Sequence, residues 1–118
     1  IRYNRQEFGD VHRDYFVEAL QAEGVPCGAG YHMPLYKQAA FKRERIAPLL
    51  AESSRPWPDY ERMYLPVAEH FCAEEQITIP HQVLLSGRQG MQSILDAIAK
   101  IKANVDELRQ VAASSAEK

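Results

Sequence analysis

Gly24-Val25-Pro26-Cys27-Gly28-Ala29-Gly30-Tyr31-His32-Met33-Pro34-Leu35-Tyr36 is the stretch around which this chain is organised. Gly24 follows an apolar-periodic run and can adopt the left-handed conformation that ends a helix, and Pro26 keeps the helix from resuming. Glycines at 28 and 30 let the backbone approach another group closely. Two interpretations stay open. In one, a short strand enters a surface loop whose aromatic side chains fold onto the core. In the other, the loop closes over a ligand bound elsewhere in a larger protein.

The residues before this stretch predict a strand and a helix. Ile1–Asn4 alternates apolar and polar side chains as a strand does. Asp10 suits the N-cap position, and apolar residues at three- and four-residue spacing follow it, so we expect a helix at about Asp10–Glu23. A second strand is expected at Val25–Gly28.

The residues after this stretch begin with a long surface excursion and end in a long helix. Between Lys42 and Tyr64 the apolar periodicity weakens, which indicates a surface segment. A short helix at Pro66–Glu75 and a strand at Ile77–Ile79 are expected next. Ser86 and Gln89 have the spacing of a capping box, and one apolar stripe then continues to Leu108.

The expected order is strand, helix, strand, excursion, helix, strand, helix. This order predicts an α+β fold with a small three-stranded sheet and helices packed on one face. We expect residues 1–111 to form one domain and residues 112–118 to be a frayed tail, since the last residues are small and polar.

Length and charge limit the classes of function. The chain has 118 residues and a formal net charge of −2, which gives no basic field for nucleic acid. No apolar run approaches the roughly 20 residues that span a bilayer, so we expect no membrane partner and a cytoplasmic location. The chain begins at Ile1 in a segment with a strand pattern, which we interpret as part of a longer protein.

Residues that could bind a metal or act in catalysis are scattered along the chain. The four histidines do not have the spacing of a metal site, so no metal ligands are predicted. Cys27 and Cys72 are expected to be reduced thiols rather than a disulfide. The glycines match neither a Walker loop nor a dinucleotide fingerprint. No catalytic residue is predicted within the chain.

Several short motifs in succession resemble a known family. They are Gly24-Val25-Pro26 leading through Tyr31 to Pro34-Leu35-Tyr36, then Leu65-Pro66-Val67-Ala68-Glu69, then Ile79-Pro80-His81, and the Ile94-Leu95-Asp96-Ala97-Ile98 helix with Lys100-Ile101. In this order and spacing they resemble the C-terminal part of the DegT/DnrJ/EryC1/StrS family of pyridoxal-phosphate-dependent aminotransferases. The similarity covers about Arg2 to Leu108.

This resemblance implies the small domain of a fold-type I transferase. Family members hold pyridoxal phosphate on a lysine of a large domain, upstream of the matched region. The implied partners are therefore that large domain, a second subunit in a homodimer, a keto substrate and an amino donor. No cofactor-binding residue is expected here, and Lys37, Lys42, Lys100 and Lys102 are assigned no Schiff-base role. The fragment alone is expected to be inactive.

The resemblance also implies substrate-binding residues at Gly30, Tyr31 and Tyr36. Many members that act on nucleotide sugars carry a histidine immediately before the tyrosine, whereas Gly30 stands there in this chain, and Tyr36 replaces a second histidine. This departure leaves a ketosugar, a cyclitol ketone or another polyhydroxylated carbonyl compound as the substrate class. A second hypothesis is a free-standing small α+β module that binds a ligand without catalysis.

Overall fold

The computed structural model describes residues 1–50 and 58–116 and divides the chain into two compact units. The first unit combines the two ends of the chain, Ile1–Gly30 and Glu74–Lys118, and the second is the intervening segment Tyr31–Ala73. Part of the expected surface excursion, residues 51–57, lies outside the described residues.

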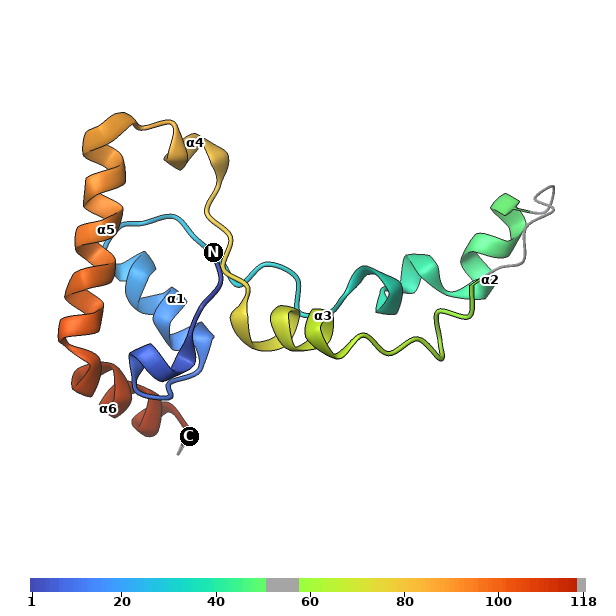
Figure 1. The fold of residues 1–118 in the computed structure, drawn as a ribbon, viewed down its shortest axis with the longest axis horizontal. Helices are drawn as coiled ribbons and strands as arrows, with labels where there is room; N and C mark the ends of the chain where they lie inside the picture. The colour runs from blue at the N-terminus through green and yellow to red at the C-terminus, as the bar shows by residue number, and fades with distance from the viewer. Residues whose placement is uncertain (51–57, 117–118) are drawn as a thin grey trace. The chain divides into compact units, whose positions relative to one another are not determined.

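The first unit is built from helices on both sides of its core (Figure 1). They are η1 (Arg5–Phe8), α1 (Arg13–Ala22), α4 (His81–Leu84), α5 (Gly87–Ala103) and α6 (Val105–Ala116). α1 packs against both α5 and α6, so the N-terminal and C-terminal parts of the chain share one core.

The core of the first unit is apolar and partly aromatic. Leu20 of α1 is fully buried and Ile77 is 2% exposed. The rings of Tyr3, Phe8 and Phe16 contact one another, with centroids 4.6 to 5.4 Å apart. The helix periodicity predicted for α1 is confirmed, since its buried side chains include Phe16, Val17 and Leu20. Each fully buried side chain of this size contributes about 1.5–3 kcal/mol.

The predicted three-stranded sheet, and with it the α+β class, is wrong. Within residues 1–50 and 58–116 there is no strand, only isolated antiparallel bridges at Arg2–Gln76 and Gly28–Thr78. The segment around Ile77 does lie between the two expected partners. Ile77 N–H donates to the Ile1 carbonyl (3.0 Å) on one side, and Gly28 and Thr78 exchange backbone hydrogen bonds (2.8 and 2.9 Å) on the other.

Local chemistry keeps these pairings one bridge long. Pro26 has no N–H to donate, and Pro80 follows the third segment directly. Gly30, two residues after the bridge at Gly28, has a φ of 71°, which turns the backbone out of the extended region. The alternating apolar residues therefore identify extended segments, but these segments do not pair over several consecutive residues.

The start of α1 differs from the prediction. Asp10 was expected as the N-cap, but it has a φ of 60° and precedes the helix. His12 is the N-cap, and its Nδ1 accepts a hydrogen bond from the Asp14 N–H (3.3 Å). An imidazole nitrogen thus supplies the acceptor that a carboxylate was expected to supply.

The predicted C-terminal helix is divided into two. α5 ends at Asn104, whose backbone N–H and side-chain Nδ2 both donate to the Lys100 carbonyl (3.1 and 2.8 Å), and α6 begins at Val105. The expected capping box is absent, because the Ser86 hydroxyl donates to the Val83 carbonyl (2.6 Å) instead of capping α5. α6 extends through the expected tail as far as Ala116.

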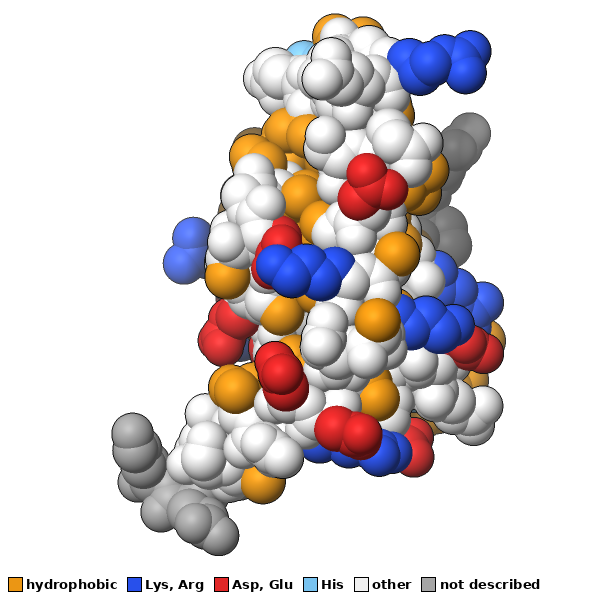
Figure 2. Space-filling model, turned by 90° about the vertical axis from the view of Figure 1, so that its left-hand side faces the viewer, with side chains coloured by type: hydrophobic (Ala, Val, Ile, Leu, Met, Phe, Trp, Pro, Cys, Tyr) orange, Lys and Arg blue, Asp and Glu red, His pale blue; other side chains and the backbone are white. Residues whose placement is uncertain are grey.

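The outer side of α5 has a mixed surface. Figure 2 looks onto the side that carries this helix, and its apolar side chains form small patches separated by polar, acidic and basic ones. Leu95 of α5 is 57% exposed, whereas Ile94 and Ile101 are buried. None of the helices in the described ranges has the length and apolar composition that crossing a bilayer requires.

The second unit consists of short helical turns. They are η2 (Leu35–Lys37), η3 (Ala39–Phe41), α2 (Arg43–Ile46), η4 (Ala47–Leu50) and α3 (Pro66–His70). The π-helical turn η5 (Phe71–Glu75) continues from α3, and its last two residues belong to the first unit. Phe41 and Tyr60 meet edge to face at 5.8 Å. Pro66 occupies the first turn of α3, as the sequence predicts.

Candidate functional site

Gly30 is the first of the three predicted substrate-binding residues. It belongs to the first unit and adopts a left-handed backbone, with φ at 71°. A Cβ at this position would lie 2.6 Å from side-chain atoms of Gln76 and 3.0 Å from the Thr78 hydroxyl. The positive φ therefore favours glycine here, and a Cβ would also force the end of the Gln76 side chain to move.

We expect Gly30→Ala to lower the free energy of unfolding by about 1–2 kcal/mol, because an L-residue is strained at this φ. Gly28→Ala is the matched control, since Gly28 has no positive φ and nothing within 4 Å of its added Cβ. Urea denaturation of both variants measures the difference. Equal stabilities for the two variants would contradict this account of Gly30.

Tyr31 begins the second unit, and its side chain is 66% exposed. Among the described residues its hydroxyl has no hydrogen-bond partner. The interpretation in which this ring folds onto the core does not match its exposure. The ring face and the hydroxyl are both free to contact another molecule.

Tyr36 has a different environment and forms a cluster with Lys37 and Glu69. Its hydroxyl donates to Glu69 Oε1 (2.5 Å) and accepts from the Leu65 N–H (3.1 Å). Lys37 follows Tyr36 in η2, and its ammonium donates to Glu69 Oε2. This Tyr36 cluster ties η2 to the N-terminus of α3, since Leu65 is the N-cap of that helix.

The electrostatics of the Tyr36 cluster favour one protonation state. The hydrogen bonds from Lys37 and then Tyr36 lower the pKa of Glu69, and the bond to Glu69 raises the pKa of Lys37. Partial burial, followed by the bond to Glu69, raises the pKa of Tyr36. Both effects favour the protonated form of Tyr36, whose hydroxyl donates to Glu69.

The predicted site residues thus have different surroundings. Tyr36 is held by Glu69 and Lys37, whereas Tyr31 is open. Sequence reasoning did not assign Glu69 a role, although the motif Leu65-Pro66-Val67-Ala68-Glu69 contains it. A carboxylate in a five-residue helix gave no signal that it would bind a tyrosine 33 residues earlier.

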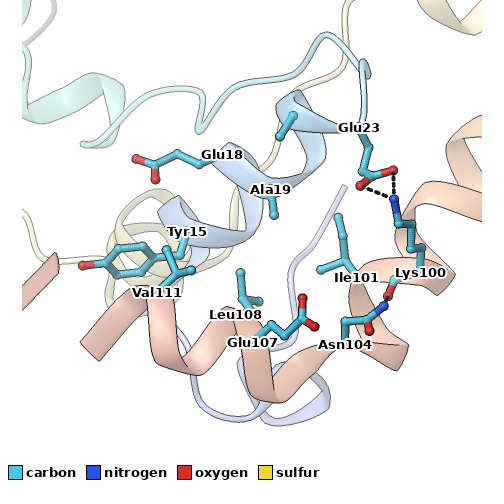
Figure 3. A pocket seen from close by; sticks show the side chains of 11 residues that line it. Tyr15, Glu18, Ala19, Glu23, Lys100, Ile101, Asn104, Glu107, Leu108 and Val111 are labelled. Atoms are coloured by element: carbon cyan, nitrogen blue, oxygen red, sulfur yellow. Dashed lines mark hydrogen bonds and ion pairs between the residues drawn. The ribbon is translucent and has the colours of Figure 1, made fainter. Parts of the chain in front are cut away.

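A concave feature lies wholly within the first unit. It is a groove of about 370 Å³ between α1 and the corner where α5 meets α6. Figure 3 shows Ala19, Ile101 and Leu108 along its middle, with Tyr15 at one end. At the other end Lys100 Nζ donates to both carboxylate oxygens of Glu23 (2.8 and 2.9 Å).

Three curated proteins are similar to this chain over most of its length, and each is named as an L-glutamine:3-amino-2,3-dideoxy-scyllo-inosose aminotransferase. The protein from Streptoalloteichus tenebrarius is 32% identical over 110 residues, or 92% of this chain. The protein from Streptomyces kanamyceticus is 31% identical over 111 residues, or 91% of this chain. The protein from Micromonospora echinospora is 28% identical over 112 residues, or 93%.

The chain is a relative of these aminotransferases. The resemblance to the DegT/DnrJ/EryC1/StrS family that the sequence motifs indicate is confirmed, since these relatives are of that type. The chain spans about a quarter of their length: 26% of the first two and 27% of the third. No family model matches the chain, and no solved structure matches it.

Lys37, Lys100 and Lys102 are ion-paired, unlike a lysine that holds pyridoxal phosphate as a Schiff base. A lysine that forms a Schiff base with a cofactor needs a lowered pKa, usually through burial. Bonding to Glu69 instead raises the pKa of Lys37. Lys100 and Lys102 are exposed and paired with Glu23 and Glu7.

Cys27 does not resemble an activated nucleophile. Neither Cys27 nor Cys72 forms a disulfide in the part of the chain that the structure describes. Burial raises the pKa of Cys27, whose Sγ donates to the Val17 carbonyl (3.7 Å), so its thiolate is disfavoured. Within residues 1–50 and 58–116, no group of three or more His, Cys, Asp and Glu side chains could hold a metal ion.

Proposed function

We propose that this chain is the C-terminal small domain of a pyridoxal-phosphate-dependent aminotransferase that acts on a ketone of a cyclitol. The observation that carries the proposal is the 32% identity over 92% of the chain with a relative named for a scyllo-inosose substrate. The cofactor would supply the electron sink for amino transfer. The lysine that holds it would belong to another part of a longer protein.

In this proposal the chain contributes walls to the substrate site. Tyr31 supports this role, because its exposed ring and hydroxyl suit a substrate with both C–H faces and hydroxyl groups. The Tyr36 cluster would fix the following turn, so that the exposed ring is presented from a defined backbone. Gly30 would allow the backbone before Tyr31 to turn without a side chain.

The exposed apolar side chains of the second unit support a further partner. Its large apolar residues with side chains more than 40% exposed include Tyr31, Met33, Leu35, Leu49, Tyr64, Leu65 and Val67. Exposed apolar side chains that gather on one surface are typical of contacts with another protein surface. We propose that members of this set other than Tyr31 and Tyr64 contact the large cofactor-binding domain. The homodimer and the cytoplasmic location inferred from the sequence stay predictions.

Half-reaction spectroscopy of the complete protein tests the proposed function. We expect bound pyridoxal phosphate, whose absorbance changes when L-glutamine is added and returns when a keto-cyclitol follows. The same additions to the 118-residue chain mixed with the cofactor should change nothing specific. A complete protein that binds no cofactor, or a bound cofactor that neither substrate affects, would contradict the proposal.

Borohydride reduction followed by peptide mapping locates the cofactor lysine. We expect one reduced pyridoxyl-lysine in the complete protein, outside the segment corresponding to residues 1–118. The physical reason is that Lys37, Lys100 and Lys102 are exposed and ion-paired. A stoichiometric label on one of these three lysines, lost together with turnover when that lysine is replaced, would contradict the assignment.

Tyr31→Ala in the complete protein tests the substrate wall. We expect kcat/KM for the keto substrate to fall by about tenfold, which corresponds to losing one polar contact of about 1.4 kcal/mol in the transition state. The melting temperature and the cofactor spectrum should stay nearly unchanged, because the ring is exposed. Tyr64→Ala, which removes an equally exposed ring, is the control. Equal kinetics for both variants would remove Tyr31 from the site.

A further inference from the structure

The groove between α1, α5 and α6 has an apolar middle and a polar rim of defined charge. Ala19, Ile101 and Leu108 line its middle (Figure 3). Ile101 and Leu108 are at most 7% exposed, so each presents only a small part of its side chain to the groove. A volume of about 370 Å³ is at the lower end of the range for small-molecule sites. The groove therefore has room for a compact apolar group.

The charges around the groove are unbalanced. Three carboxylates line it, from Glu18, Glu23 and Glu107, against one ammonium, from Lys100. Both oxygens of Glu23 accept from Lys100, so that ammonium is already neutralised. Within the part of the chain that the structure describes, the Glu18 and Glu107 side chains have no hydrogen bond or ion pair.

The two unpaired carboxylates lie on different walls. Glu18 belongs to α1 and lies with Tyr15 at the end of the groove opposite the Glu23–Lys100 pair, whereas Glu107 belongs to α6 and lies beside Leu108 (Figure 3). A ligand lying over the apolar middle would therefore meet a carboxylate from either wall and no available cation. This arrangement disfavours an anion and favours an amine.

We propose that this groove is a binding site for a small organic amine, in which an apolar body lies over Ala19, Ile101 and Leu108 and a primary ammonium pairs with Glu107 or Glu18. The apolar contact supplies most of the affinity, and the carboxylates select the cationic head group. The proposal is independent of the aminotransferase assignment, since it uses none of the residues placed in the substrate wall.

Amide chemical-shift mapping of the ¹⁵N-labelled chain tests the proposal with a matched pair of probes, 4-phenylbutylamine and 4-phenylbutyrate. We expect the amine to shift amides of α1 and of residues 100–111 in a saturable way, and the carboxylate to leave them unchanged. Butylamine, which keeps the charge but lacks the aromatic ring, should bind more weakly than 4-phenylbutylamine. Added sodium chloride should weaken amine binding.

Charge-neutral variants identify the groups that select the amine. Glu107→Gln should weaken 4-phenylbutylamine binding by about two- to fivefold, and the Glu18→Gln, Glu107→Gln double variant by more, as expected for exposed ion pairs. Glu44→Gln, in α2 of the second unit, is the control and should bind as the unmodified chain does. Equal binding of both probes, shifts confined to other regions, or no saturable shift would each overturn the proposal.

Discussion

Phe16→Ala should lower the free energy of unfolding by about 3–5 kcal/mol. Phe16 is 4% exposed and its ring contacts Phe8 (4.6 Å between centroids) and Tyr3 (5.1 Å). Removing it leaves a cavity at the centre of the aromatic cluster and also removes ring–ring contacts worth about 0.5–1.5 kcal/mol each. For a domain whose total stability is about 5–15 kcal/mol, this loss is a large fraction.

Urea denaturation monitored by circular dichroism measures this effect. Tyr31→Ala is the matched control, since it removes a larger aromatic side chain from an exposed position and should cost little. Similar losses for the two variants would mean that Phe16 is not central to the core. Phe16→Leu should recover part of the loss, because it refills most of the volume.

Tyr3 should make stability fall between about pH 10 and about pH 12. Burial raises the pKa of Tyr3 to about 12, whereas a tyrosine in the unfolded chain titrates near about 10. Its contribution is therefore fully present below about pH 10 and is lost as pH rises through the folded value, because the unfolded state ionises first. This difference in pKa between the folded and unfolded states corresponds to about 2–3 kcal/mol in the free energy of unfolding.

Tyr3→Phe separates the ionisation of Tyr3 from other causes of lost stability at alkaline pH. The variant loses the hydrogen bond from the Tyr3 hydroxyl to the Val11 carbonyl (3.0 Å), so it starts about 1 kcal/mol less stable at neutral pH. Its stability should then fall less steeply than that of the unmodified chain above about pH 10. Parallel curves for the two proteins across this range would show that Tyr3 does not carry the dependence.

Local periodicity was enough to predict the main helices of the fold. α1 and the α5–α6 stripe appear where three- and four-residue apolar spacing places them, and Ile94, Ile101 and Leu108 are buried. The break at Asn104 could not be predicted, because it depends on a side-chain bond to the Lys100 carbonyl. Polar bonds of this kind leave no periodic signal.

The prediction of a sheet was wrong for a related reason. Alternating residues at Ile1–Asn4 and Ile77–Ile79 identify extended backbone, and those segments do meet. Whether they form a ladder depends on how many consecutive residues pair, which Gly30 and the prolines limit. The burial of Arg13, which is 1% exposed, could not be predicted either, since charged residues are seldom fully buried.

The candidate site was only partly accessible from the sequence. The resemblance assigned Tyr31 and Tyr36 one role, but the structure gives them different surroundings. Glu69 and Lys37 come together with Tyr36 through tertiary packing of η2 against α3, which no local pattern encodes. The unpaired carboxylates of the groove likewise depend on helix packing rather than on sequence spacing.

Transfer of an isotope-labelled amino group tests the central proposal most directly. The complete protein is incubated with L-glutamine carrying ¹⁵N in its 2-amino group and with 3-amino-2,3-dideoxy-scyllo-inosose, the ketone in the names of the relatives. The account predicts a product with a second amino group that contains ¹⁵N, formed more slowly by the Tyr31→Ala protein and at the normal rate by Tyr64→Ala. A fully folded protein with bound cofactor that incorporates no ¹⁵N into this ketone or another keto-cyclitol would contradict it.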